Sequence, residues 1–480
     1  MDLVTVILFL VLYYIRPQEW SSAFSAIHFV QIVLLVAIST LFTRSRSLGL
    51  ADLFQTPHDW MIFGFWLWLV MSAPSPWSAF KDYLNLYIFY IVVVQTLYSV
   101  PRMILFVGWW TYLVVFISLL ALASQWGIDP LGSADLTQGP MQGRLSLNLS
   151  IFNNPNALGH SAVPAIPMLF FYCIWRRPII SRLLGTALLS IPIYCIYLTQ
   201  SKGSFLSGGV TIVATALFGR PKTFQIIVIV AVLMFGSSAV YMLPRMNEIA
   251  KSKTDPAIQG RVAAFKHGYN VLTITKTGVG KGNWFTSFFA AHHYYKAAHS
   301  TYVMIGGELG YPGLFFLCGV FFCCLRTLVT ARTDTSDEER LRRMLFVLVV
   351  SYMVSSWMVN FEYRPTFFMF AGATAALHRH LHGILREPEK AEEESEIPLP
   401  VWRAAMLPRP AAGGGLPSVY VATSDLLTES QESLGEPAPS PAFSSRIEGG
   451  WNRIGWFDIA MTSLMVWALV KFWAYIMMRM

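Results

Sequence analysis

The chain has 480 residues, of which 55% are hydrophobic, 15% aromatic and only 13% charged. Because soluble domains carry roughly 25% charged residues, this composition excludes a water-soluble enzyme, a disordered protein and a disulfide-rich secreted scaffold. A polytopic membrane protein remains. Its formal net charge of +8 raises the question of what the excess basic residues do.

Apolar runs that are long enough for membrane helices, which need about 20 mostly apolar residues, recur along the chain. We therefore expect an all-α fold with about 12 transmembrane helices in a core over residues 1–384. The expected core spans are 3–15, 26–43, 59–73, 84–100, 103–123, 157–175, 183–199, 203–219, 223–243, 301–325, 344–361 and 366–384. The first run is alternatively a signal peptide. Asp2 stands where such a peptide has basic residues, which favours an uncleaved helix.

The composition changes after the core. Residues 387–396 are rich in acid, and a Pro/Gly/Ser-rich stretch continues to Gly450. Such a segment cannot bury enough apolar surface to fold, so we expect a disordered cytoplasmic linker over 385–454. A last apolar run predicts a C-terminal transmembrane helix within 455–480.

Basic residues in the short loops predict the orientation, because cytoplasmic loops of membrane proteins carry an excess of Lys and Arg. The richer of the two alternating sets of loops contains Arg44, Arg46, Arg102, Arg176, Arg177, Arg182, Arg220, Lys222, Arg326, Arg332, Arg340, Arg342 and Arg343. The poorer set contains Arg16, Lys81, Arg144, Lys202 and Arg364. This bias predicts a cytoplasmic N-terminus. Loops 124–156, 200–202, 244–300 and 362–365 are then on the outer side, and 244–300 is the large outer loop.

Two polar segments on the predicted outer side hold basic residues close to helix starts. Gly143-Arg144 precedes Asn154-Pro155-Asn156, a turn and helix-start signal. A helix cap accounts for Asn156 but not for Arg144. In the second segment, the very short turn 199–204 fixes Lys202 near the membrane surface.

A third segment begins an amphipathic stretch at Arg261 and reaches a Gly-rich turn with Gly278 and Gly280. Exposed backbone N–H groups in such a turn form a candidate anion nest. The turn lacks the full P-loop spacing and lies on the wrong side of the membrane for ATP, which excludes nucleotide binding.

The fourth segment contains His299, where the long loop enters a helix, and Glu308, an acid inside an apolar span. Intramembrane acids are costly and usually functional. Nine residues of a continuous helix place the two side chains on opposite faces and about 14 Å apart along the axis. We therefore expect Glu308 to bond to a neighbouring helix and His299 to perform chemistry.

Together these segments resemble the bacterial O-antigen ligase and polymerase superfamily of inner-membrane proteins. The matching pieces are Gly-Arg with the later Asn-Pro-Asn-x-Leu-Gly, Ser-Lys-Gly in a short outer turn, Arg-x-x-x-Phe before Gly-x-Gly, and His-Ser-x-Tyr with Glu-Leu-Gly-x-x-Gly. The early Tyr-Ile-Arg-Pro-Gln-Glu of residues 14–19 also resembles the branch found with exopolysaccharide and exosortase systems. The resemblance covers residues 1–384.

The resemblance implies a GT-C-like fold in the bacterial inner membrane. It also implies that a glycan is transferred from undecaprenyl diphosphate to an acceptor sugar hydroxyl at the periplasmic face, with inversion and without a metal or other cofactor. A ligase uses a lipid A core as acceptor, and a polymerase uses another lipid-linked repeat unit. By the same resemblance Arg144, Lys202 and Arg261 would hold the diphosphate, and His299 would act on the acceptor hydroxyl. The candidate supporting residues are Glu308, Gly278, Gly280 and Arg364.

These residue types suit the implied chemistry. Fixed cations stabilise the negative charge that grows on a departing diphosphate, and a histidine with a pKa near 6.5 suits a general base. The family often has Arg where this chain has Lys202, and lysine supplies charge without a bidentate fork.

Two other functions remain open. A lipid-linked glycan flippase or other transporter binds the same diphosphate, but charges through its spans and related halves are expected. A nonenzymatic scaffold explains the tail and leaves the outer basic residues unexplained.

The expected partners are the lipid-linked donor, the lipid- or glycan-linked acceptor and membrane lipids. A flippase and a chain-length regulator are candidate further partners, and no nucleic acid is expected.

Overall fold

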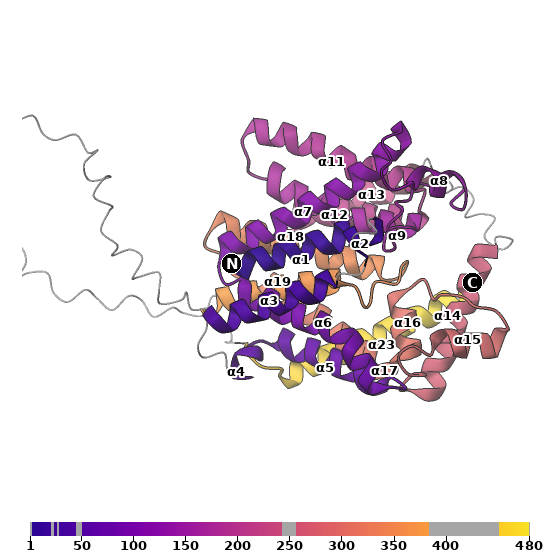
Figure 1. Cartoon of the computed structure of the whole chain (residues 1–480). Coiled ribbons are helices and arrows are strands. Elements are labelled where there is room, and N and C mark those ends of the chain that lie inside the picture. The colour runs from indigo at the N-terminus through magenta and orange to yellow at the C-terminus, as the bar shows by residue number, and fades with distance from the viewer. Residues whose placement is uncertain are drawn as a thin grey trace, which may run out of the picture.

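The computed structural model describes residues 2–20, 24–25, 28–44, 50–241, 256–383 and 451–479. Within these ranges every regular element is a helix and no strand occurs (Figure 1), which confirms the all-α fold class. Arg46, residues 242–255 of the predicted outer loop and residues 385–450 of the predicted linker lie outside the described residues.

The helices fall where the apolar runs predict them. The first half of the chain forms α1 (Asp2–Ile15), α2 (Pro17–Trp20), α3 (Phe29–Arg44), α4 (Leu50–Leu53), α5 (Pro57–Ser72), α6 (Pro76–Thr96), α7 (Val100–Ala123), η2 (Ser124–Trp126), α8 (Ser133–Gln138), α9 (Pro155–Ala162), α10 (Ala165–Leu169), η3 (Phe170–Ile174), α11 (Ile179–Thr199), α12 (Lys202–Leu217) and α13 (Lys222–Tyr241). The second half forms α14 (Pro256–Thr275), α15 (Trp284–His292), α16 (Thr301–Glu308), α17 (Gly310–Thr330), α18 (Ser336–Ser355), α19 (Pro365–Leu381) and α23 (Trp456–Arg479). Proline in the first turn starts α5, α6, α7, α9 and α19, where its missing N–H costs no hydrogen bond.

Among the described residues, six helical segments are long and apolar enough to cross a membrane. They are Asp2–Trp20, Val100–Trp126, Pro155–Ile174, Ile179–Thr199, Gly310–Thr330 and Trp456–Arg479. Other expected spans are shorter, such as α5 and α12 with 16 residues each, or begin with charged residues, as α18 does. The chain is therefore a multi-pass membrane protein, and the count of about 12 core helices stays a prediction.

The loops gather at two ends of the helix bundle. At one end, which we call the Arg144 end, Ser150 donates to Glu19, and Arg364 donates to the Ile151 carbonyl. At the other, the Arg343 end, Arg102 binds Asp2 and Arg343 donates to the Phe218 carbonyl. Figure 1 shows α8 and α15 at the first end and α4 with the N-terminus at the second. The two ends correspond to the two predicted sets of loops, and the side of the membrane that each faces stays a prediction.

The span predicted at 301–325 is two helices, so the prediction of one continuous helix is wrong. α16 ends at Glu308 and α17 begins at Gly310, whose φ is +66°. A Cβ at Gly310 would lie 2.3 Å from the Lys276 carbonyl oxygen. Glycine is therefore required both by the left-handed backbone and by the approach of the 276–277 turn.

The described part of the predicted loop 244–300 contains two helices, α14 and α15. One side of α14 buries Val262, Ala264, Phe265 and Leu272, which gives the amphipathic stretch a core to pack against. Most of this region is therefore folded, and α14 holds a fixed place beside α16 and α23.

The last helix, α23, packs against the core through both of its ends. Trp473 is fully buried, and its Nε1 donates to the Phe265 carbonyl of α14 at 3.2 Å. Near the other end, the buried Asp458 accepts hydrogen bonds from Trp451 Nε1 and the Gly455 N–H, both at 2.8 Å, and forms an ion pair with Arg326 of α17.

Replacing Asp458 by Asn should therefore destabilise the protein. Arg326, whose side chain is 28% exposed, then loses its ion-pair partner, and Trp451 Nε1 and the Gly455 N–H lose a charged acceptor, so the cost is about 1–3 kcal/mol. The measurement is thermal unfolding of the purified full chain in detergent. Asp135→Asn, at an exposed carboxylate of α8, is the control and should unfold as the wild type does. Equal stability of Asp458→Asn and wild type would contradict this role of the ion pair.

Candidate functional site

Arg144 is fixed between the end of α11 and the start of α9. Its Nε donates to the Thr199 carbonyl at 3.1 Å, and its Nη2 donates to Asn156 Oδ1 at 2.9 Å. The neighbouring Leu145 N–H donates to the Leu198 carbonyl at 3.0 Å. These bonds fix the Arg144 guanidinium next to the turn that follows Thr199.

The Asn-Pro-Asn cluster divides two tasks between its asparagines. Asn154 is the N-cap of α9 and accepts from the Asn156 N–H at 2.9 Å, and Pro155 occupies the first turn. The Asn156 side chain binds Arg144 instead. The interpretation of Asn156 as the helix cap is therefore wrong, because the cap lies two residues earlier.

Lys202 is the first residue of α12. Gln200 has a left-handed φ of +49°, and Ser201 caps the helix by accepting from the Ser204 N–H. A Cβ at Gly203 would lie 2.8 Å from Met358 Cβ and 2.9 Å from His160 Nε2. The turn that carries Lys202 therefore lies directly against His160 and the α18–α19 connection, residues 356–364.

His160 is a buried residue of this site that the sequence did not single out. Its Nδ1 lies 3.1 Å from Ser355 Oγ and 3.2 Å from Ser207 Oγ, so it joins α9 to α18 and α12. In the described part of the chain, its buried Nε2 has no hydrogen-bond partner. The glycine at 203 leaves room for this nitrogen beside the Lys202 turn.

Arg261 and Lys296 bring positive charge to His299. Arg261, on α14, interacts electrostatically with the imidazoles of both His160 and His299, and Lys296 interacts with His299. Lys296 also lies across α14, since a Cβ at Gly260 would be 2.7 Å from Lys296 Cε. The sequence offered one signal for Lys296, a basic residue three positions before the candidate histidine.

The connection 356–364 fixes the position of His299. The next residue, Ser300, caps α16 and donates to the Ser356 carbonyl at 3.0 Å. The Thr301 N–H donates to the carbonyls of Ser356 at 2.7 Å and Val359 at 3.0 Å. His299 itself has a left-handed φ of +50°, an uncommon conformation for a residue with a side chain.

These contacts form one continuous series. Arg144 is bonded to Thr199 at the start of the Lys202 turn, and that turn touches His160 and Met358. The connection that contains Met358 binds Thr301, beside His299, and Arg261 interacts with both histidines. The structure therefore brings the four main candidate residues, which are far apart in sequence, to one region of the Arg144 end.

Burial, together with the charges of Arg261 and Lys296, lowers the pKa of His299 to about 4. This is below the value near 6.5 that the residue type suggests, because both burial and nearby cations disfavour imidazolium. The His299 imidazole is thus neutral near pH 7 and can accept a proton. An anion bound beside it would raise this pKa and make it a stronger base.

Glu308 belongs to a separate cluster. Its carboxylate accepts from Lys281 Nζ at 3.0 Å, the Gly282 N–H at 2.9 Å and the Tyr363 hydroxyl at 3.1 Å. Its partners are the Gly-rich turn and the 356–364 connection, so the predicted bond to a neighbouring helix is wrong.

The Gly-rich turn holds the carboxylate of the protein itself in place of an external anion. The Gly280 N–H donates to the Glu308 carbonyl at 2.8 Å, and a Cβ at Gly278 would lie 2.3 Å from that same oxygen. Gly278 and Gly280 therefore permit the turn to pack on the end of α16, and the candidate anion nest at this turn is already occupied.

Arg364 and Glu362 complete the connection between α18 and α19. Arg364 Nη1 donates to the Ile151 carbonyl at 3.0 Å, and its guanidinium lies 4.6 Å from the Phe361 ring centre, which supports the segment after Arg144. Glu362 is buried with an unpartnered Oε2 within the described structure. Burial raises the pKa of Glu362 to about 7. The sequence carries no signal for Glu362, because this residue adjoins an apolar run.

The pKa of His299 generates a direct test. The histidine should become protonated near pH 4, and Lys296→Met should move its midpoint upward because one positive charge is removed. Hydrogen–deuterium exchange at the imidazole C2, followed by mass spectrometry of the full chain, measures this midpoint. Lys281→Met, in the Glu308 cluster, should leave it unchanged. A midpoint near 6.5 in the wild type would refute the described environment.

Comparison with known proteins adds one match. Residues 185–318 match the family model described as O-antigen ligase. The matched segment includes Lys202, Arg261 and His299, and Arg144 precedes it. A comparison with curated proteins found no match.

Proposed function

We propose that this chain, which belongs to the O-antigen ligase and polymerase superfamily, transfers a glycan from an undecaprenyl diphosphate carrier to the hydroxyl of an acceptor sugar. The observation that carries the proposal is that Arg261 lies near a neutral His299, while Arg144 and the Lys202 turn are linked to the same region through Thr199, His160 and Met358. Cations and a proton acceptor in one region are the two elements that this reaction needs.

The cations act on the leaving group. The bond between the sugar C1 and the diphosphate oxygen breaks, and its electron pair remains on the diphosphate. Arg144, Lys202 and Arg261 stabilise this charge, and hydrogen bonds to Thr199 and Asn156 fix the Arg144 guanidinium before the reaction begins. Lys202 stands at the start of α12, where the backbone N–H groups also favour an anion.

His299 acts on the acceptor. The acceptor oxygen attacks C1 from the face opposite the diphosphate, which inverts the anomeric centre, and the hydroxyl proton passes to the imidazole. The low pKa of His299 keeps the free imidazole neutral, and the negative diphosphate raises its basicity when the donor binds. Lys296 modulates this pKa without touching the substrate.

The predicted orientation places the site at the periplasmic face of the bacterial inner membrane, since the Arg144 end carries the loops with fewer basic residues. The acceptor is a lipid A core or a second lipid-linked repeat unit, so the product is a ligated glycan or a lengthened O-antigen or exopolysaccharide chain.

The test measures the rate at which the purified full chain transfers glycan between lipid-linked repeat units. His299→Gln should reduce the transfer rate about 100- to 10,000-fold, the usual contribution of a general base. Arg261→Gln should reduce it about 100- to 1,000-fold through loss of charge stabilisation. His293→Asn and Lys266→Gln replace exposed residues of the same region and should transfer glycan at the wild-type rate.

The products decide between the candidate functions. New glycosidic bonds in the wild type and their loss in His299→Gln support the proposal. Movement of the lipid-linked glycan across vesicle membranes without new bonds would identify a flippase. If the wild type shows neither new bonds nor movement, a scaffold remains. Wild-type transfer by His299→Gln would contradict the assignment of the base.

A further inference from the structure

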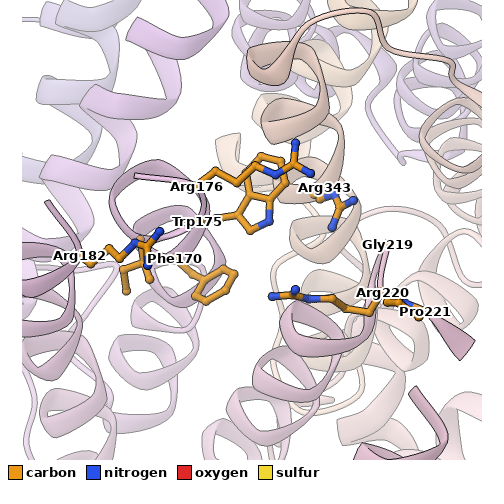
Figure 2. Close-up of a pocket in the computed structure, with 9 residues that line it drawn as sticks. Phe170, Trp175, Arg176, Arg182, Gly219, Arg220, Pro221 and Arg343 are labelled. Carbon is orange, nitrogen blue, oxygen red and sulfur yellow. The ribbon is translucent and has the colours of Figure 1, made fainter. Parts of the chain in front are cut away.

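A cavity of about 430 Å³ lies at the Arg343 end, away from the site described above. It is bounded by η3, the start of α11, the α12–α13 turn and α18 (Figure 2). Its lining includes the side chains of Arg176, Arg182, Arg220 and Arg343, and no acidic residue among those described. In Figure 2, Arg182 and Arg220 flank the Phe170 ring, with Trp175 and Arg176 above it.

Aromatic and hydrogen-bond contacts hold one wall of this cavity in place. The centre of the Trp175 ring lies 4.7 Å from Arg176 Cζ and 5.0 Å from Arg343 Cζ. Arg343 also donates to the Phe218 carbonyl at 3.2 Å. Gly219 has a φ of +71°, and a Cβ there would lie 2.3 Å from Arg343 Cζ. Glycine at this position therefore lets the guanidinium reach the cavity.

The charge of the cavity is only partly compensated. Glu339 pairs with Arg343 at 2.6 Å. Within the described residues, Arg176, Arg182 and Arg220 form no ion pair with a carboxylate. Three of the four guanidinium groups that border the cavity thus have no carboxylate partner among the described residues. Guanidinium groups bind phosphate oxygens through paired hydrogen bonds.

Apolar surface continues from the mouth of the cavity along two helices. Ile179 and Ile180, beside Arg182 at the start of α11, are 66% and 69% exposed. Ile226 and Ile227, beyond Arg220 on α13, are each 61% exposed. A ligand that fits both features carries an anionic head and apolar tails.

We propose that this cavity binds the phosphate headgroup of an anionic membrane phospholipid, whose acyl chains lie along α11 and α13. Basic pockets between membrane helices favour such headgroups because each Lys or Arg gains from a lipid phosphate. A soluble phosphate would use the arginines and leave the apolar faces unused. This site is independent of the proposed glycan transfer, which takes place at the other end of the molecule.

Native mass spectrometry of the full chain in detergent, with added phosphatidylglycerol or phosphatidylcholine, tests the proposal. The wild type should retain phosphatidylglycerol in preference to the zwitterionic lipid. Arg182→Gln/Arg220→Gln should weaken phosphatidylglycerol binding roughly tenfold to thirtyfold. Arg453→Gln, an exposed arginine at the same end but outside the cavity, should bind as the wild type does.

Three results would overturn the proposal. They are equal retention of the two lipids by the wild type, unchanged lipid binding by the folded double variant, and displacement of phosphatidylglycerol by an equal concentration of inorganic phosphate. The last would identify a site for soluble anions. The lipid preference of the wild type needs no variant, so the test stands even where the double variant fails to fold.

Discussion

The connection between α18 and α19 is the constraint on which the candidate site depends. Its Ser356 and Val359 carbonyls accept the Thr301 N–H, and its Phe361 N–H donates to Thr301 Oγ1 at 2.9 Å. The same segment presents Met358 to the Lys202 turn and Arg364 to the segment after Arg144. This short connection therefore positions residues from three separate parts of the chain.

Two groups of charges at the Arg144 end have different tasks. Lys281 and Glu308 neutralise each other within the protein and fix the Gly-rich turn to the break between α16 and α17. Arg261 and Lys296 instead act on His299, where burial and then these two charges lower the pKa of the imidazole. The first arrangement stabilises structure. The second keeps a histidine neutral beside cations. In the proposed reaction, a diphosphate bound to these cations would increase the basicity of the imidazole.

Helix positions could be predicted from the sequence because apolar runs and prolines mark them locally. The break at Leu309 could not, because Gly310 is one of several glycines nearby, and only contact with Lys276 shows which of them ends the helix. The four main candidate residues could be selected from the sequence because they lie in polar segments between apolar runs. His160 and Lys296 were missed because their roles depend on contacts across the fold, such as His160 with Ser355, which lies 195 residues away. The occupied Gly-rich turn was misinterpreted for the same reason, since its partner Glu308 comes from another helix.

The central claim is that the cations of the Arg144 end bind a lipid diphosphate while His299 performs a separate chemical step. The affinity of the purified full chain for undecaprenyl diphosphate tests it most directly. Arg261→Gln should bind about tenfold or more weakly than the wild type. Lys266→Gln should bind as the wild type does, and His299→Gln should keep the donor affinity within about twofold, because a general base acts on the acceptor. Equal affinity of Arg261→Gln and the wild type would contradict the account.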